Sequence, residues 1–128
     1  MVSNLVVTWG PSVLWAGVLF LLSHQPDLPN PFEWALADKA GHLVVYAVLG
    51  WTLGRGRLRT GMPHALILAA GLAWAASDEI HQSFVPGRFP SGGDLVADAV
   101  GIALGYYLTL KFASTPRRAP TPAPEGAD

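Results

Sequence analysis

The chain has 128 residues, a length that accommodates one domain with a single core. Apolar residues make up 51% of the chain and charged residues only 13%, whereas soluble domains carry about 25% charged residues. The lack of cysteine excludes disulfides and thiol chemistry, and the net charge of −1 gives no sign of a nucleic-acid partner. This composition favours a membrane-embedded chain, with a small soluble helical bundle as the alternative.

The first apolar segment, Leu5–Leu22, is long enough to cross a bilayer by itself, since a spanning helix needs roughly 20 residues. Pro11 predicts a kink within it. The segment lacks a basic leader and a clear small-residue cleavage site, so we expect it to be retained rather than removed as a signal peptide.

Three further apolar segments are less uniform. Ala40–Leu53 is short for a span, and Ala65–Val85 reaches span length only by including two acidic residues. Leu95–Phe112 includes one acidic and one basic residue. The second and fourth segments carry the G-x-x-x-G pairs Gly50/Gly54 and Gly101/Gly105, which predict close helix packing.

The connections between the segments alternate in charge. Ser23–Asp38 and Val85–Asp94 are acidic and predicted to be outer loops, the second with a tight turn at Pro86-Gly87. Ser91 and Asp94 have the spacing of a helix N-terminal capping pair. Most basic residues lie in the linker after the second segment, or at the end of the fourth segment and beyond it: Arg55, Arg57, Arg59, Lys111, Arg117 and Arg118.

By the positive-inside rule, this distribution places both termini in the cytoplasm. We therefore predict an all-α fold, an integral membrane bundle of four transmembrane helices formed by residues 1–113. The Pro/Ala-rich residues 114–128 are predicted to be a disordered cytoplasmic tail.

Polar residues recur at helical spacing near the outer ends of the last three segments, and one arginine lies in the loop between the third and the fourth. Residues three or four apart share a helix face, so we expect one site near the outer leaflet. Ionisable groups at this depth are costly and are functional candidates. The predicted ligand-binding residues are Lys39, His42, Tyr46, Asp78, Glu79, Gln82, Arg88, Asp94 and Asp98.

The acidic residues of this set outnumber the basic ones, so protonated carboxylates, a histidinium or a bound cation must balance the charge. Asp78-x-x-His81 and Asp38-x-x-x-His42 place pairs of metal-binding residue types on single helix faces. Because no H-E-x-x-H or comparable signature is present, no metal or cofactor is predicted. Purely structural roles stay open, such as an Asp78–Arg88 ion pair.

Several motifs resemble those of the VanZ-like family of bacterial membrane proteins: "SHQP", "DKAGHLVVYAVLGW" and "SDEIHQSFVPGRFPSGGDLVADAVGIALG". The resemblance covers Ser23–Gly105, with Ser-His-Gln where Ser-Ser-Gln is common and a Gly-Gly pair before Asp94. The matching positions are Lys39, His42, Tyr46, Leu49, Gly50, Asp78, Glu79, Gln82, Pro86, Arg88, Ser91, Asp94, Asp98 and Gly101.

The resemblance implies a multi-pass protein of the bacterial cytoplasmic (inner) membrane with a role in the cell envelope. The founding member is associated with low-level resistance to teicoplanin, a lipoglycopeptide antibiotic. The family motifs bring no catalytic assignment, so the chemistry must be argued from the site.

Three functions fit the predicted site. The first is binding of a lipid headgroup, a lipid-linked saccharide or a lipoglycopeptide. The second is a membrane-embedded hydrolase or transferase acting on such a molecule, with Asp78, Glu79, His42 and His81 as catalytic candidates. The third is a proton-coupled transporter or flippase. Membrane lipids are the expected partners, nucleic acid is not, and homo-oligomerisation stays open.

Overall fold

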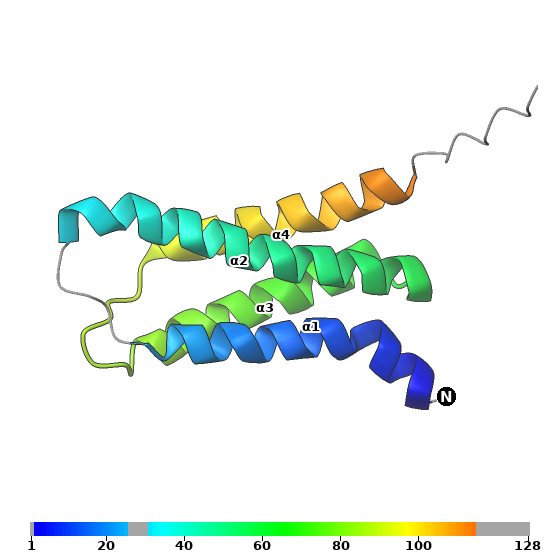
Figure 1. Ribbon diagram of the computed structural model, residues 1–128, viewed down its shortest axis with the longest axis horizontal. Coiled ribbons are helices and arrows are strands. Elements are labelled where there is room, and N and C mark those ends of the chain that lie inside the picture. The colour runs from blue at the N-terminus through cyan, green and yellow to red at the C-terminus, as the bar shows by residue number, and fades with distance from the viewer. Residues whose placement is uncertain (1, 26–30, 115–128) are drawn as a thin grey trace, which may run out of the picture.

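A computed structural model describes residues 2–25 and 31–114, and this part of the chain is all-helical. The four helices are α1 (Val2–Ser23), α2 (Pro31–Thr60), α3 (His64–Gln82) and α4 (Gly92–Ala113) (Figure 1). The predicted all-α class is thus confirmed. The predicted disordered tail, residues 114–128, lies outside the described residues except for Ser114, which ends α4 as its C-cap.

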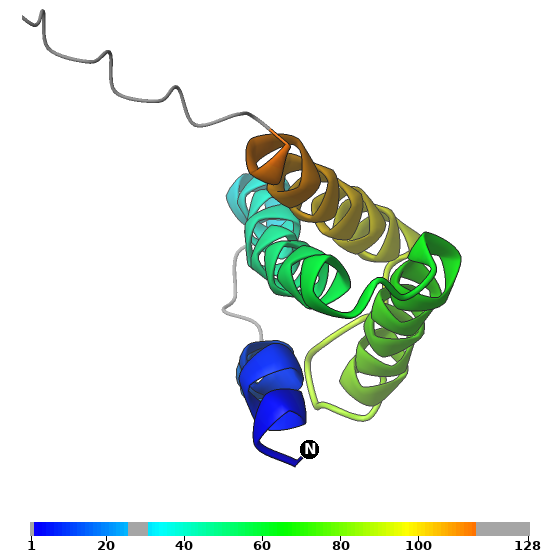
Figure 2. The same ribbon diagram turned by 90° about the vertical axis from the view of Figure 1, so that its right-hand side faces the viewer.

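The helices run roughly along one long axis, with α2 and α4 side by side (Figures 1 and 2). Contacts join α2 to α4 along both helices, α3 packs against α2 and α4, and α1 packs against α2 and α3. The start of α1 and the end of α4 lie at the same end of the bundle (Figure 1). The opposite end is where α2 and α4 begin and α3 ends.

Glycines bring α2 and α4 into backbone contact. A Cβ atom added to Gly50 would overlap the carbonyl group of Ile102, and one added to Gly105 would overlap that of Ala47. Gly101 and Gly54 face the partner helix in the same way. The predicted role of the two G-x-x-x-G pairs is confirmed, and the structure adds that they pack against each other.

Helix α1 is held to α2 by its tryptophans. The indole Nε1 of Trp15 donates to the carbonyl oxygen of Val45 at 2.8 Å. Gly56 leaves room for the ring of Trp9, which a Cβ at that position would overlap.

Large apolar side chains point outward on all four helices: among others Leu14, Val44, Ile80 and Tyr107, each more than half exposed. By length and hydropathy, two of the helices could cross a membrane, over Asn4–Ser23 and Gly92–Ala113. An apolar outer surface of this extent is unfavourable in water and favourable in lipid. This surface and the two apolar helices are those expected of a membrane protein.

The boundaries of α2 differ from the prediction. The helix starts at Pro31 and ends at Thr60, so residues 31–38 are helical rather than part of an outer loop, and the arginine-rich linker is helical as well. Proline is favoured in the first turn of a helix. The helix ends where Gly61 adopts a positive φ of 69°, a conformation that glycine allows at a helix C-terminus. The prediction had placed the ends of the helix where charged residues begin, but these residues mark only the ends of the apolar stretch.

The predicted turn between α3 and α4 is confirmed. The N–H of Arg88 donates to the carbonyl oxygen of Val85 at 3.1 Å, and Gly87 has a φ of 83°. Proline followed by glycine with positive φ is the pattern of a type II turn. This turn leads the chain back to Ser91, where α4 begins.

Candidate functional site

Two polar contacts join α2 to α4 near the end where both helices begin. The Nζ of Lys39 lies 2.8 Å from Oδ1 of Asp94, forming an ion pair. One turn further in, Nδ1 of His42 lies 2.8 Å from Oδ1 of Asp98. The helical spacing of these residues therefore aligns them as the sequence predicted.

Two further contacts bring α3 into the same group. The hydroxyl of Tyr46 donates to Oδ2 of Asp78 at 2.8 Å. The backbone N–H of Ser91, just before α4, donates to Oε2 of Glu79 at 3.1 Å. Polar residues of α2, α3 and α4 thus meet in one place.

We call this group the polar cluster. Its members are deeply buried, and the exposed fraction of Asp98 is 0%. The side chain of Lys39 is 43% exposed and lies at the edge of the cluster. Asp98 is the seventh residue of α4 and lies about 9 Å from the start of that helix at a rise of about 1.5 Å per residue. The polar cluster consists of His42, Tyr46, Asp78, Glu79, Asp94 and Asp98, and Gln82 is buried one turn past Asp78 on α3.

Three carboxylate oxygens of the polar cluster are buried without a hydrogen-bond partner among the described residues: Oδ1 of Asp78, Oε1 of Glu79 and Oδ2 of Asp98. A buried polar atom without a partner costs about 1–3 kcal/mol, and more when it is charged. Each of these side chains is held in place through its other oxygen. The arrangement leaves acceptor atoms oriented and available to a cation or to a hydrogen-bond donor.

The predicted capping pair is confirmed in one half. The side chain of Ser91 accepts from the N–H of Gly93 at 3.2 Å, as an N-cap residue does. The carboxylate of Asp94 binds Lys39 instead of the N–H of Ser91, which is taken by Glu79. A carboxylate from another helix completes the cap, which the spacing within one segment could not reveal.

Two predicted site residues have their described contacts outside the polar cluster. Arg88 donates from Nη1 to the carbonyl oxygen of Gln25 at 3.2 Å, and Asp78 bonds Tyr46 rather than forming the ion pair with Arg88 considered above. The ring of His81 packs on Phe20 of α1 with 4.4 Å between centroids. Its Nε2 lies 3.3 Å from Nδ1 of His24.

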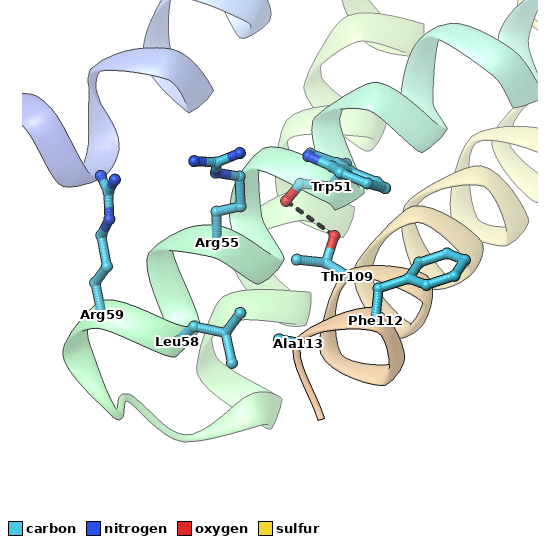
Figure 3. Close-up of a pocket in the computed structure, with 7 residues that line it drawn as sticks. All are labelled: Trp51, Arg55, Leu58, Arg59, Thr109, Phe112 and Ala113. Atoms are coloured by element: carbon cyan, nitrogen blue, oxygen red, sulfur yellow. Dashed lines mark hydrogen bonds between the residues drawn. The ribbon is translucent and has the colours of Figure 1, made fainter. Parts of the chain in front are cut away.

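The other end of the bundle carries a pocket between α2 and α4 (Figure 3). Within it, Oγ1 of Thr109 donates to the carbonyl oxygen of Trp51 at 3.3 Å. Residues of the polar cluster take no part in it. The lining residues are Trp51, Arg55, Leu58, Arg59, Thr109, Phe112 and Ala113.

A polar pair near this end was not anticipated. Nδ1 of His64 lies 2.7 Å from the hydroxyl oxygen of Tyr106, and the tyrosine is fully buried. The two residues belong to α3 and α4 and are 42 positions apart. No spacing rule within a helix connects them, so the sequence carried no signal for the pair.

Comparison with known proteins supports the family that the sequence motifs indicated. No curated protein and no solved structure matches the chain at a significant level. A family model described as VanZ/LLP1 matches residues 4–113, a range that includes every residue of the polar cluster. The match covers nearly all of the described helices, and the chain therefore belongs to the VanZ/LLP1 family.

Proposed function

We propose that the polar cluster binds the headgroup of an envelope lipid, a lipid-linked saccharide or a lipoglycopeptide at the outer face of the bacterial cytoplasmic membrane. The observation that carries this proposal is the set of three buried, oriented carboxylate oxygens without a partner among the described residues. They lie inside a helix bundle whose outer surface is apolar. Such a bundle brings its polar site to the depth of lipid headgroups.

The proposed orientation rests on the arrangement of the helices and the arginines. The start of α1 and the end of α4 lie at the same end of the bundle (Figure 1), as four antiparallel spans require. Arg55, Arg57 and Arg59 lie in the last turns of α2, at that same end. Basic residues are enriched on the cytoplasmic side, so the polar cluster would lie on the outer side.

The side chains of the cluster suit a ligand with both hydroxyl and acidic groups. The unpartnered oxygens can accept hydrogen bonds from sugar hydroxyls or from an amine. Lys39, which is partly exposed at the edge of the cluster, can pair with a phosphate or carboxylate. Arg88, on the loop before α4, can supply a second, bidentate contact.

A hydrolase or transferase acting on the same ligand is the second candidate. The buried contact between His42 and Asp98, at 2.8 Å, is the arrangement that orients a histidine for proton transfer. Glu79, with one free oxygen, could then act as general base. Binding and chemistry would thus use the same residues.

Mass spectrometry of envelope lipids and lipid-linked intermediates tests these two candidates. Cells would express wild type or Glu79→Gln at equal levels in the membrane. A lipid species that changes mass or abundance only with the wild type would establish the enzyme and its substrate class. Co-purification of one lipid with the wild type, without such a change, is the result expected for binding.

Substitutions within the proposed site test the proposal directly. We expect Asp78→Asn, Glu79→Gln and Arg88→Ala to abolish ligand co-purification and the cellular phenotype while membrane insertion is retained. Arg55→Ala, in the pocket at the other end of the bundle, is the matched control and should leave both unchanged. Full activity of the three variants at equal protein levels would refute a role for this site.

A further inference from the structure

We infer that His42, Glu79 and Asp98 bind a divalent transition-metal cation, Mn²⁺ or Zn²⁺. One potential ligand atom from each of these residues lies within 4.8 Å of the others, and all three residues are buried. Donor atoms around an ion with bonds of about 2.0–2.2 Å lie roughly 3–4 Å apart. Small adjustments of the side chains would therefore bring the three donors onto one ion.

The free carboxylate oxygens are the second, independent observation. Among the described residues, Oε1 of Glu79 and Oδ2 of Asp98 have no hydrogen-bond partner, and the two residues are 8% and 0% exposed. The other oxygen of Glu79 is held by the N–H of Ser91. Contacts of this kind orient metal ligands in known sites.

The contact between His42 and Asp98 also suits a cation. A ring nitrogen and a carboxylate oxygen 2.8 Å apart can be bridged by a metal ion in place of a proton. Charge favours this exchange, because Asp78 and Glu79 lie near Asp98. Among the described residues, Lys39 and His42 are the basic groups paired with carboxylates of this cluster. A buried excess of negative charge is costly without a cation.

A second group, Asp38, His42 and Asp94, has similar spacing but is the weaker candidate. The carboxylate of Asp94 is already paired with Lys39, and the side chain of Asp38 is 40% exposed.

The mixed nitrogen and oxygen donors of the first group, His42, Glu79 and Asp98, select the type of ion, since imidazole favours transition metals over Mg²⁺ and Ca²⁺. The three ligands come from three different helices, so no signature within one segment of the sequence marked the site.

The role of the ion rests on the proposed function. A site with three protein ligands leaves coordination positions open, and the phosphate of a lipid headgroup is a suitable ligand for them. Binding of the ion itself requires no lipid. The two proposals can therefore fail separately.

Binding of Mn²⁺ to the purified full chain in detergent micelles, after removal of metals with EDTA, tests the inference. We expect one Mn²⁺ per chain by calorimetry, and affinity reduced at least about tenfold in Glu79→Gln and Asp98→Asn. His24→Gln, which changes an exposed histidine next to His81, is the matched control and should bind like the wild type. Equal affinity of all four proteins, or loss of binding in the control alone, would overturn the inference.

Pulsed EPR of Mn²⁺ bound to the wild type gives a test that does not depend on how well the variants fold. We expect the signal of one imidazole nitrogen in the spectrum of the wild type. A spectrum with oxygen ligands alone would contradict the site. The metal-binding measurements contain no lipid, so a failure to bind Mn²⁺ would leave headgroup binding open. Likewise, an unchanged lipid profile in cells would leave metal binding open.

Discussion

Tyr46 shows how a single side chain links two helices within the polar cluster. Its ring is 1% exposed and belongs to the apolar core, while its hydroxyl donates to Asp78 of α3. The other oxygen of Asp78 has no partner among the described residues. Among the described residues, the hydroxyl of Tyr46 is therefore the side-chain donor that offsets the cost of burying the Asp78 carboxylate.

Tyr46→Phe should destabilise the protein by about 1–2 kcal/mol, because it removes this donor and leaves the carboxylate of Asp78 uncompensated. The measurement is unfolding of the helical signal in mixed micelles at increasing denaturing detergent. Tyr107→Phe, at a tyrosine of α4 that is 55% exposed, should change stability by less than about 0.5 kcal/mol. Equal stability of Tyr46→Phe and wild type would show that the hydrogen bond contributes nothing.

At the level of the helices, the close contact of α2 and α4 sets the geometry of the polar cluster. The distances from Lys39 to Asp94 and from His42 to Asp98 depend on how near the two helix axes lie. The glycine pairs determine that separation, since their Cβ atoms would overlap backbone atoms of the partner helix. The packing of α2 against α4 therefore sets the distances within the polar cluster.

Gly105→Ala should destabilise the protein by about 1–3 kcal/mol, because the backbone of Ala47 cannot move aside without separating the helices. Gly17→Ala is the control, since a Cβ at that position of α1 meets no atom within 4 Å. It should be neutral or stabilise by up to about 1 kcal/mol. If both variants unfold at the same point, the contact between α2 and α4 is not tight.

The start of α4 depends on Ser91. Its hydroxyl caps the helix and its N–H holds Glu79. Ser91→Ala removes the hydroxyl alone and should cost about 1 kcal/mol in the same unfolding measurement. Ser114→Ala, at the exposed end of α4, should cost less. A Ser91→Ala variant as stable as wild type would contradict the capping role.

For the whole molecule, the proposed orientation follows from features that belong to no single helix. The helices have outward apolar side chains, the start of α1 and the end of α4 lie at one end, and the polar cluster lies near the other. These are the features expected of a bundle that crosses a membrane. Two of the helices could cross a membrane on length and hydropathy alone. In α3 the buried acidic residues Asp78 and Glu79 lower the apolarity, and α2 carries several charged residues, among them Lys39, Arg57 and Arg59.

The absence of cysteine makes the orientation measurable with single cysteines. We expect Phe89→Cys, on the exposed loop before α4, to react with a membrane-impermeant maleimide added to intact cells. Ser114→Cys, at the end of α4, should react only after the membrane is opened. The reverse pattern would invert the topology, and reaction of both in intact cells would exclude four spans.

The sequence by itself determined the family, the helical class, the turn at Pro86-Gly87 and the residues of the polar cluster, because helical spacing and turn chemistry are local. It also identified the glycine pairs, but not the partner of each. It misjudged the ends of α2, because helical hydrogen bonding continues through charged residues and stops at Gly61.

Only the tertiary structure decided which polar residues meet. It joined His42 to Asp98, Tyr46 to Asp78 and Glu79 to the backbone of Ser91, and it directed His81 toward α1. These partners lie on different helices, and the neighbours of a helix depend on the packing of the whole bundle. Spacing along the chain assigns a residue to a face, whereas packing alone brings two faces together.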